Sequence, residues 1–389
     1  MRALRSLRHA LAVVDPLGWA VACLGVLAGV VAVVAGWREA GVVAVACLLL
    51  LVLAAPFVLG RTRVRVDVTA EPRRVVAGAS VAVGVVVTNT ASRRLLPVTL
   101  ALPVGASVHR YALPALRPGA AHLEDLLLRT ERRGVVAVGP ASTRRGDPVG
   151  VFSRDVVWTD VQEVLVRPVM VPLESLGAGL LRDLEGVTTD AVTSSDLAFH
   201  ALREYAPGDD LRHVHWRSSA KVGQLLVRQY QDTRRSHATV VVDDDPAAWG
   251  DDDELETAMG VAASIVARAT LDDFAATFVC GRQVVTGTDG NQVLDAVCRA
   301  ATEGRGLLAG AQEAARVAPD TSLLFLLGGT GTSFATLTRA AATHGPQVRR
   351  LGLLVDPAAR AHVREAGDVP VLTLARRDDL APLLRWGAS

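Results

Sequence analysis

The sequence lacks the features that usually mark an extracellular or nucleic-acid-binding protein. It has only four cysteines in 389 residues. Cys23 and Cys47 lie in long apolar runs, and Cys280 and Cys298 lack metal-ligand spacing, so neither disulfides nor structural zinc are expected. Lys and Arg, 41 in total, nearly balance the 40 Asp and Glu residues. The net charge therefore gives no reason to expect a nucleic-acid partner.

Familiar catalytic motifs are also missing from the sequence. It contains no G-x-S-x-G, no H-E-x-x-H and no Cys-His pair. The glycine-rich run Gly328–Ser333 has neither the lysine of a Walker motif nor the spacing of a dinucleotide fingerprint, so we interpret it as a strand-to-helix turn. These absences favour a non-enzymatic protein.

Long hydrophobic runs, by contrast, are present near the start of the chain. Leu17–Gly36 and Ala40–Gly60 are uncharged apart from the break at Arg38 and Glu39. Each is long enough to cross a hydrocarbon core of about 30 Å as a helix. A signal peptide is the alternative for the first run, but its apolar core is too long for one and no cleavage site follows. We predict two membrane spans within residues 1–63.

Arginines flank the two predicted spans on one side of the membrane. Arg2, Arg5 and Arg8 precede the first span, and Arg61, Arg63 and Arg65 follow the second. The positive-inside rule therefore predicts that both ends of the hairpin, and the soluble region, are cytoplasmic.

Residues 64–169 alternate apolar and polar side chains in short runs separated by Pro, Gly and Asn. This pattern predicts β-strands at Val64–Val68, Val81–Val87, Val98–Leu102, Leu123–Leu128, Val135–Val138 and Glu163–Val166. Runs of this length and spacing indicate a small antiparallel β-sandwich-like domain. No acid, base and nucleophile come together in it, so we expect a spacer or binding module.

Residues 170–237 begin with a linker, Met170–Asp196, rich in Gly, Thr, Ser and acids. From residue 238 on, strands and helices alternate. We expect strands at Thr239–Val242, Ala275–Val279, Leu323–Leu327, Leu351–Val355 and Val369–Leu374. Helices are expected at Asp252–Thr270 and near Val293, Ala335, Ala358 and Leu380. This alternation predicts an α/β domain, residues 238–389, with a parallel sheet covered on both faces.

The densest run of unusual residues is the signature segment, Arg203–Arg228. Pro207-Gly208-Asp209-Asp210 predicts a backbone corner. The cations of the segment could bind its own acids, or a phosphate or acidic peptide. His213 and His215 would share one face of a strand, without an evident third metal ligand.

The signature segment closely resembles the motif of the DUF58 family. The residues that carry the resemblance, and that we take as candidates for partner binding, are Arg203, Glu204, Tyr205, Pro207, Gly208, Asp209, Asp210, Arg212, Trp216, Arg217, Ser219, Lys221, Gly223 and Arg228. Arg132-Arg133-Gly134, Gly139-Pro140 and Asp147–Phe152 resemble a second, weaker pattern of the family.

The resemblance implies that the α/β domain is von Willebrand A-like. The metal site of such domains begins D-x-S-x-S after the first buried strand, where this chain has Asp243-Asp244-Asp245-Pro246-Ala247. Asp243 matches, but Asp245 and Ala247 replace the serines, so the expected Mg²⁺ site is degenerate. Asp243 and Asp245 could still bind a hard cation.

Three hypotheses for function follow. The resemblance implies a membrane-anchored adaptor that works with a MoxR-type AAA+ ATPase and a transglutaminase-like membrane protein. The second hypothesis is a hydrolase that uses a metal ion on Asp243 and Asp245. The third is a passive membrane scaffold without a specific partner.

Overall fold

The computed structural model describes residues 14–59, 63–147, 149–176, 197–206, 214–232 and 236–386. The chain divides into two compact units, residues 1–167 and 168–389. We describe each unit by itself.

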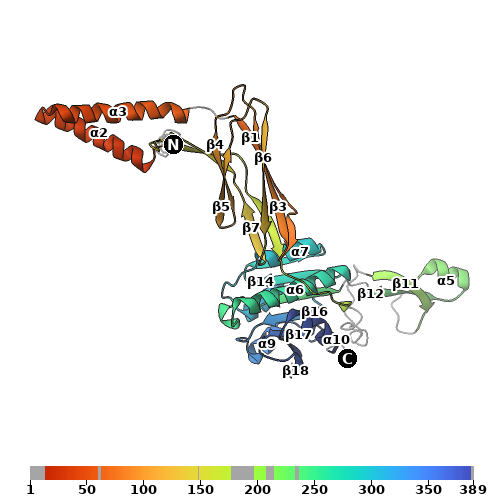
Figure 1. Cartoon of the computed structure of the whole chain (residues 1–389). Coiled ribbons are helices and arrows are strands. Elements are labelled where there is room, and N and C mark those ends of the chain that lie inside the picture. The colour runs from red at the N-terminus through yellow and green to blue at the C-terminus, as the bar shows by residue number, and fades with distance from the viewer. Residues whose placement is uncertain are drawn as a thin grey trace. The chain divides into compact units, whose positions relative to one another are not determined.

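The first unit begins with two long apolar helices, α2 (Pro16–Ala35) and α3 (Arg38–Leu59). They pack side by side as a hairpin (Figure 1). Small residues allow the close approach, because a Cβ added at Gly25 would lie 3.0 Å from the Cβ of Cys47, and one added at Gly29 would lie 3.8 Å from that of Ala44. Both helices are long and apolar enough to cross a membrane, as the sequence predicts.

The remainder of the first unit is built from ten strands in two sheets (Figure 1). The strands are β1 (Val64–Glu71), β2 (Arg74–Val76), β3 (Ser80–Asn89), β4 (Val98–Val104), β5 (Ser107–Leu113), β6 (Ala121–Arg129), β7 (Gly134–Val138), β8 (Ser142–Gly146), β9 (Ser153–Val157) and β10 (Gln162–Arg167). One sheet has the order β1-β3-β6. The other has the order β2-β10-β7-β4-β8-β9, with β5 paired to β4.

Alternation of side chains builds the core of this β-domain. Along β3, Val81, Val83, Val85 and Val87 are buried, and they pack with Leu100 and other apolar residues of the second sheet. The predicted strands are all present. Their pairing is antiparallel except between β2 and β10, which run parallel.

The second unit begins with an extended segment that packs on its core. Met170, Val171 and Leu173 contact the core, and Leu176 is buried. The N–H of Leu176 donates to Asp272 Oδ2 at 2.7 Å. The start of the predicted linker is therefore part of the folded unit, and residues 177–196 lie outside the described part of the chain.

The signature segment folds as two strands and one short helix. Strand β11 (Leu197–Glu204) pairs antiparallel with β12 (Leu226–Asp232), and α5 (Trp216–Val222) lies between them in the chain. We call β11, α5 and β12 the signature hairpin.

The α/β part of the second unit holds a seven-stranded sheet of order β15-β14-β13-β16-β17-β19-β18. Its strands are β13 (His237–Val242), β14 (Ala275–Cys280), β15 (Gln283–Gly287), β16 (Leu323–Gly328), β17 (Arg349–Val355), β18 (His362–Ala366) and β19 (Val369–Leu374). Its helices are η2 (Pro246–Ala248), α6 (Asp252–Leu271), α7 (Gly290–Arg299), α8 (Leu307–Val317), α9 (Phe334–Ala341), η3 (Arg377–Asp379) and α10 (Leu380–Trp386).

Helices cover both faces of this sheet (Figure 1). On β13, Val240 and Val242 face the core that contains α6, α7 and α10, whereas Val241 faces α8 and α9. All the strands that the sequence predicts are present, and so are four of the five predicted helices.

Two expectations about this unit are wrong. The sheet is mixed rather than parallel, because the strands at its two ends, β15 and β18, run antiparallel to their neighbours. The helix predicted near Ala358 is a turn, in which the N–H of Ala358 donates to Asp356 Oδ1 at 3.0 Å before the chain enters β18. This side-chain bond offers the backbone an alternative to a helical turn.

Candidate functional site

The short helix of the signature hairpin is fixed at both ends and along its inner face. His215 caps its start, since His215 Nδ1 accepts the N–H of Ser218 at 3.2 Å. Gly223 ends it with a φ of 77°, a left-handed conformation that suits glycine. Ser219 is buried and bridges α5 to β12, because its Oγ accepts the N–H of Leu226 at 2.9 Å.

This arrangement corrects the expectation that His213 and His215 share a strand face. Val214 forms an isolated bridge with Val227, and His215 is a helix cap rather than a strand residue. His213 lies outside the described residues. The imidazole of His215 already has a hydrogen-bond partner, so a capping role accounts for it.

The outer face of α5 is exposed. Trp216 is 64% exposed, and Ala220, one turn later, is exposed beside it. Arg217 and Lys221 are exposed and lie four residues apart, so they form a cationic row next to this apolar pair. The side chains of Arg217 and Lys221 make no hydrogen bond or ion pair with the part of the chain that the structure describes.

The remaining candidates of the signature segment are placed only in part. Arg203 pairs in register with Val227, and Arg228 with Leu202. The N–H of Tyr205 donates to Leu225 O at 2.9 Å, next to Glu204 at the end of β11. Pro207, Gly208, Asp209, Asp210 and Arg212 lie outside the described residues.

A second candidate region lies where the carboxyl ends of β13 and β16 meet. In the sheet, β14 lies on one side of β13 and β16 lies on the other, so the order of strands reverses between β13 and β16. In open α/β sheets, ligands bind at such a reversal of strand order. The three aspartates Asp243, Asp244 and Asp245 lie here, directly after β13.

Each of these aspartates makes different contacts. Asp243 Oδ1 accepts the N–H of Asp245 at 3.1 Å, and Oδ2 accepts the hydroxyl of Thr332 at 3.3 Å. The carboxylate of Asp244 accepts the N–H of Gly306 at 2.7 Å and that of Arg305 at 3.2 Å, so it satisfies the start of α8. Asp245 Oδ1 accepts the N–H of Ala247 and caps η2.

Glu254 is a residue of this region that the sequence analysis missed. It is only 5% exposed. Its carboxylate accepts the N–H of Gly250 at 2.9 Å, the N–H of Thr330 at 3.2 Å and the hydroxyl of Thr330 at 3.1 Å. Asp251 three residues earlier caps α6, so the pattern D-x-x-E was the available signal. Glu254 thereby fixes the glycine-rich turn that carries Thr332.

A pocket of about 200 Å³ opens between these loops, lined among others by Asp243, Asp245, Arg305, Leu307 and Thr332. Burial raises the pKa of Asp243 above its ordinary value of 3.8. The charges of Asp245 and Asp244 raise this pKa further, against the hydrogen bonds from Asp245 and Thr332. Perturbed carboxyl groups in a pocket are typical of binding sites.

The residues present do not complete a metal site. Asp243 and Asp245 each have an oxygen engaged by a backbone N–H, and Ala247 and Ala248 offer no side-chain oxygen. Within the described ranges no cluster of three or more His, Cys, Asp or Glu residues could hold a metal. Mg²⁺ requires near-octahedral oxygen coordination, so the donor set fits it poorly, and we derive no reaction step through a metal.

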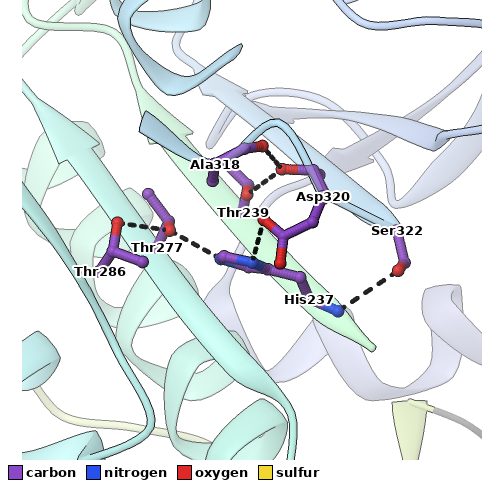
Figure 2. Close-up of polar contacts among 8 residues, drawn as sticks. His237, Thr239, Thr277, Thr286, Ala318, Asp320 and Ser322 are labelled. Atoms are coloured by element: carbon purple, nitrogen blue, oxygen red, sulfur yellow. Dashed lines mark hydrogen bonds and ion pairs between the residues drawn. The ribbon is translucent and has the colours of Figure 1, made fainter. Parts of the chain in front are cut away.

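A buried polar cluster lies at the opposite, amino end of the sheet (Figure 2). His237 is 2% exposed, and its Nδ1 and Nε2 lie 3.0 Å from Asp320 Oδ1 and 2.8 Å from Thr277 Oγ1. Thr277 Oγ1 is also 2.8 Å from Thr286 Oγ1. Every polar group of His237 is satisfied, as burial requires. We assign it a structural role.

Comparison with solved structures finds only remote similarity. The CARDB domain of a Pyrococcus furiosus protein, solved with two metal ions, shares 12% identity over 27% of this chain and 92% of its own, with a TM-score of 0.21. The sporulation control protein Spo0M of Bacillus subtilis shares 14% identity over 44% of this chain and 90% of its own, with a TM-score of 0.17. A putative β-galactosidase of Bacteroides fragilis has 12% identity and a TM-score of 0.21, over 77% of this chain and 40% of its own. Similarity this low carries no argument about fold or function.

Among curated proteins no significant match is found. A family model does match. Residues 201–303, about a quarter of the chain, match DUF58, described as a protein of unknown function. The matched range begins in β11, includes α5 and β12, and continues through the three aspartates and Glu254 to the turn before α8. The motif at Arg203–Arg228 and this match agree, so residues 201–303 of the chain match the DUF58 family.

Proposed function

We propose that the protein is a membrane-anchored, non-enzymatic adaptor that binds a protein partner through the outer face of α5. The observation that carries this proposal is the contrast within the signature segment. His215, Ser219 and Gly223 hold α5 rigidly, whereas Trp216, Arg217 and Lys221 are exposed. Exposed tryptophan and arginine are the residues that contribute most to protein interfaces.

In this proposal α2 and α3 cross the membrane, and the arginines that flank them keep the soluble region in the cytoplasm. The four parts are the hairpin 1–63, the β-sandwich 64–169, the signature region 170–237 and a von Willebrand A-like domain 238–389. Five strands of the last part run parallel with helices on both faces, which supports the comparison with such domains.

For the partner we propose a MoxR-type AAA+ ATPase, together with a transglutaminase-like membrane protein. This identification rests on the family resemblance and on no contact in the chain, since a shared fold does not fix function. The metal-dependent hydrolase loses support because the donor set at Asp243 and Asp245 is incomplete.

The test is recovery of bound proteins with the tagged full-length chain from its native membranes, with and without ATP. We expect an AAA+ ATPase to bind in a nucleotide-dependent way. Trp216→Ala and Lys221→Glu should each reduce its recovery about tenfold or more, as loss of an interface hot spot does. Arg339→Glu reverses an exposed charge on α9 and should leave recovery unchanged.

Two results would contradict the proposal. If no protein binds in a nucleotide-dependent way, the passive scaffold becomes the better hypothesis. If an ATPase binds equally well to the wild type, Trp216→Ala and Lys221→Glu, then α5 is not the docking surface.

A further inference from the structure

The segment Asp147–Phe152, which is separate from the signature hairpin, contacts the beginning of α2. Val14 forms an antiparallel bridge with Phe152. The N–H of Asp15 donates to Val151 O at 3.1 Å. The backbone of Val14 and Asp15 is therefore bonded to this segment directly before the first apolar helix begins.

The side chain of Asp15 strengthens this contact. Its Oδ1 accepts the hydroxyl of Ser153 at 2.8 Å and Arg144 Nη2 at 3.1 Å. Arg144 Nη2 also donates to Ser153 Oγ at 3.0 Å, so the three side chains bond one another. The charged pair is partly exposed, with 60% of the Arg144 side chain accessible, and its contribution to stability is correspondingly modest.

Gly18 brings α2 still closer to the β-domain. It is buried, and a Cβ added to it would collide with the carbonyl oxygen of Val151. The first turn of α2 thus rests on the backbone at Val151. Glycine is required at this position by the close approach rather than by an unusual φ.

The loop that receives α2 is itself well ordered by hydrogen bonds. Asp147 is buried, and its carboxylate accepts the N–H of Val149 at 2.9 Å and that of Phe152 at 2.6 Å. Gly150 has a φ of 79°, which a turn here requires. Val149 at the tip is 52% exposed. We call Asp147 and residues 149–153 the docking loop.

The length of α2 fixes the depth of this loop relative to a membrane. The 20 residues of α2 at a rise of about 1.5 Å span about 30 Å, the full thickness of a hydrocarbon core. Pro16 then lies at the boundary of that core, and Asp15 among the headgroups. Trp19 and Trp37, both exposed near the two ends of α2, suit the two interfaces.

We propose that the docking loop lies in the phospholipid headgroup layer, where it holds α2 against the β-domain and inserts Val149 among the lipids. This proposal rests on α2 crossing the membrane, which is part of the proposed function, but it adds the place at which the soluble region touches the lipid. Residues that contact Asp15 and Gly18 cannot lie deep in the cytoplasm if α2 is inserted.

The charges around the loop decide which lipids it accepts. Arg144 and Arg154 are exposed on β8 and β9 and can contact lipid phosphate. Asp15 and Asp155 lie beside them, and Arg144 pairs in register with Asp155. Because the acids offset the arginines, we expect the loop to enter zwitterionic membranes as well as anionic ones.

The experiment places a fluorescent probe on the loop of the full-length protein in lipid nanodiscs. Cys23→Ala and Cys47→Ala remove one exposed and one partly exposed native thiol, while Cys280 and Cys298 are buried. Val149→Cys is then labelled with an environment-sensitive dye. Val108→Cys is the matched control, since Val108 is 48% exposed. It lies away from the docking loop along the same sheet: Val108 pairs with Pro103 on β4, and Arg144 pairs with Thr99, four positions earlier on that strand.

We expect blue-shifted emission from the probe at position 149, and several-fold stronger quenching by lipids that carry a shallow quencher than at position 108. The result should be the same in phosphatidylcholine nanodiscs and in nanodiscs with added phosphatidylglycerol. Quenching at position 149 only in nanodiscs with phosphatidylglycerol would contradict insertion into both kinds of membrane and would indicate a purely electrostatic contact with anionic lipid. Emission at position 149 that matches position 108 in both would overturn the proposal.

A pair of glycine variants tests whether the loop is held by α2. Gly18→Ala forces α2 away from Val151 and should return the probe at position 149 to a water-like signal. Gly29→Ala is the control, because its added Cβ would lie 3.8 Å from Ala44, an ordinary contact. If Gly18→Ala leaves the signal unchanged, the clamp on α2 is refuted.

Alkaline carbonate extraction of the same variants separates this proposal from the proposed function. A protein that stays in the membrane while its probe reports water contradicts the docking loop alone. A protein that is extracted contradicts the membrane span, and the docking loop with it. Neither result depends on whether α5 binds a partner.

Discussion

Removal of the Glu254 carboxylate should destabilise the second unit, because three donors would lose their buried acceptor. These donors are the N–H groups of Gly250 and Thr330 and the hydroxyl of Thr330. A hydrogen bond to a charged group contributes about 1.5–3 kcal/mol. The turn lies near the pocket, so water can reach some of these groups. We therefore expect Glu254→Ala to cost about 2–4 kcal/mol in the free energy of unfolding.

Glu254→Gln should cost less, about 1–2 kcal/mol, because the amide oxygen still accepts but the NH₂ group cannot. The assay is urea unfolding of the full-length protein in detergent, followed by tryptophan fluorescence. Trp249 reports on this region, since its Nε1 donates to Asp243 O at 3.1 Å. Hydrogen exchange at the amide of Thr330 should accelerate in both variants, more so in Glu254→Ala.

The control is Glu313→Ala. Glu313 lies on α8, where its carboxylate accepts a hydrogen bond from Arg316 at the surface, and such exposed pairs contribute little to stability. If Glu254→Ala proves no more destabilising than Glu313→Ala, and exchange at Thr330 is unchanged, then the carboxylate does not hold the turn. The account of this region would be wrong.

Three further predictions follow from single groups. Asp243→Asn should stabilise the fold at neutral pH. A raised folded-state pKa means that the stability of the wild type falls as pH rises from 3.8 through that folded-state pKa. The unfolding curves of the wild type and the variant should therefore lie close together at pH 4 and separate at pH 7. Asp147→Ala should have the opposite profile. Burial acts to raise the pKa of Asp147, but the hydrogen bonds from the N–H groups of Phe152 and Val149 outweigh it and leave the pKa lowered. The stability that the variant loses at neutral pH should therefore shrink as pH falls below 3.8 and through the lower folded-state pKa. Equal losses of stability at pH 3 and pH 7 would contradict this. Thr277→Val should cost about 1–3 kcal/mol in thermal or urea unfolding, because it leaves His237 Nε2 buried without a partner, and a change below about 0.5 kcal/mol would show that water replaces the hydroxyl.

The sequence predicted the elements whose pattern is local. Alternation along Val81–Val87 and the unbroken apolar run Leu323–Leu327 are enough to define buried strands. Helix α8 was missed because Gly304 and Gly306 lie directly before it and Gly310 interrupts its apolar period. The turn at Asp356 was mistaken for a helix because Pro357 and the alanines after it suit a first helical turn equally well.

The candidate sites show the limit of local pattern. Asp243 was identified from its place after a strand. Its partner Thr332 is 89 residues away, and Glu254 bonds Thr330 across 76 residues, distances that no periodicity reveals. In the signature segment the sequence identified the residues but not which of them are buried and which are exposed. Only the structure separates Ser219, which is buried against β12, from Trp216, which is exposed.

The antiparallel strands at the two ends of the seven-stranded sheet have a consequence for how the protein associates. A parallel strand left at an edge offers a template on which another chain can add a strand. Here each edge is instead a strand of five residues, and β18 exposes Arg364 and Glu365. The short length of both edge strands, together with the charges on β18, discourages strand addition, both by partners that bind in this way and by other copies of the chain. If α2 and α3 anchor the chain as proposed, many copies can crowd on one membrane surface without their sheets joining.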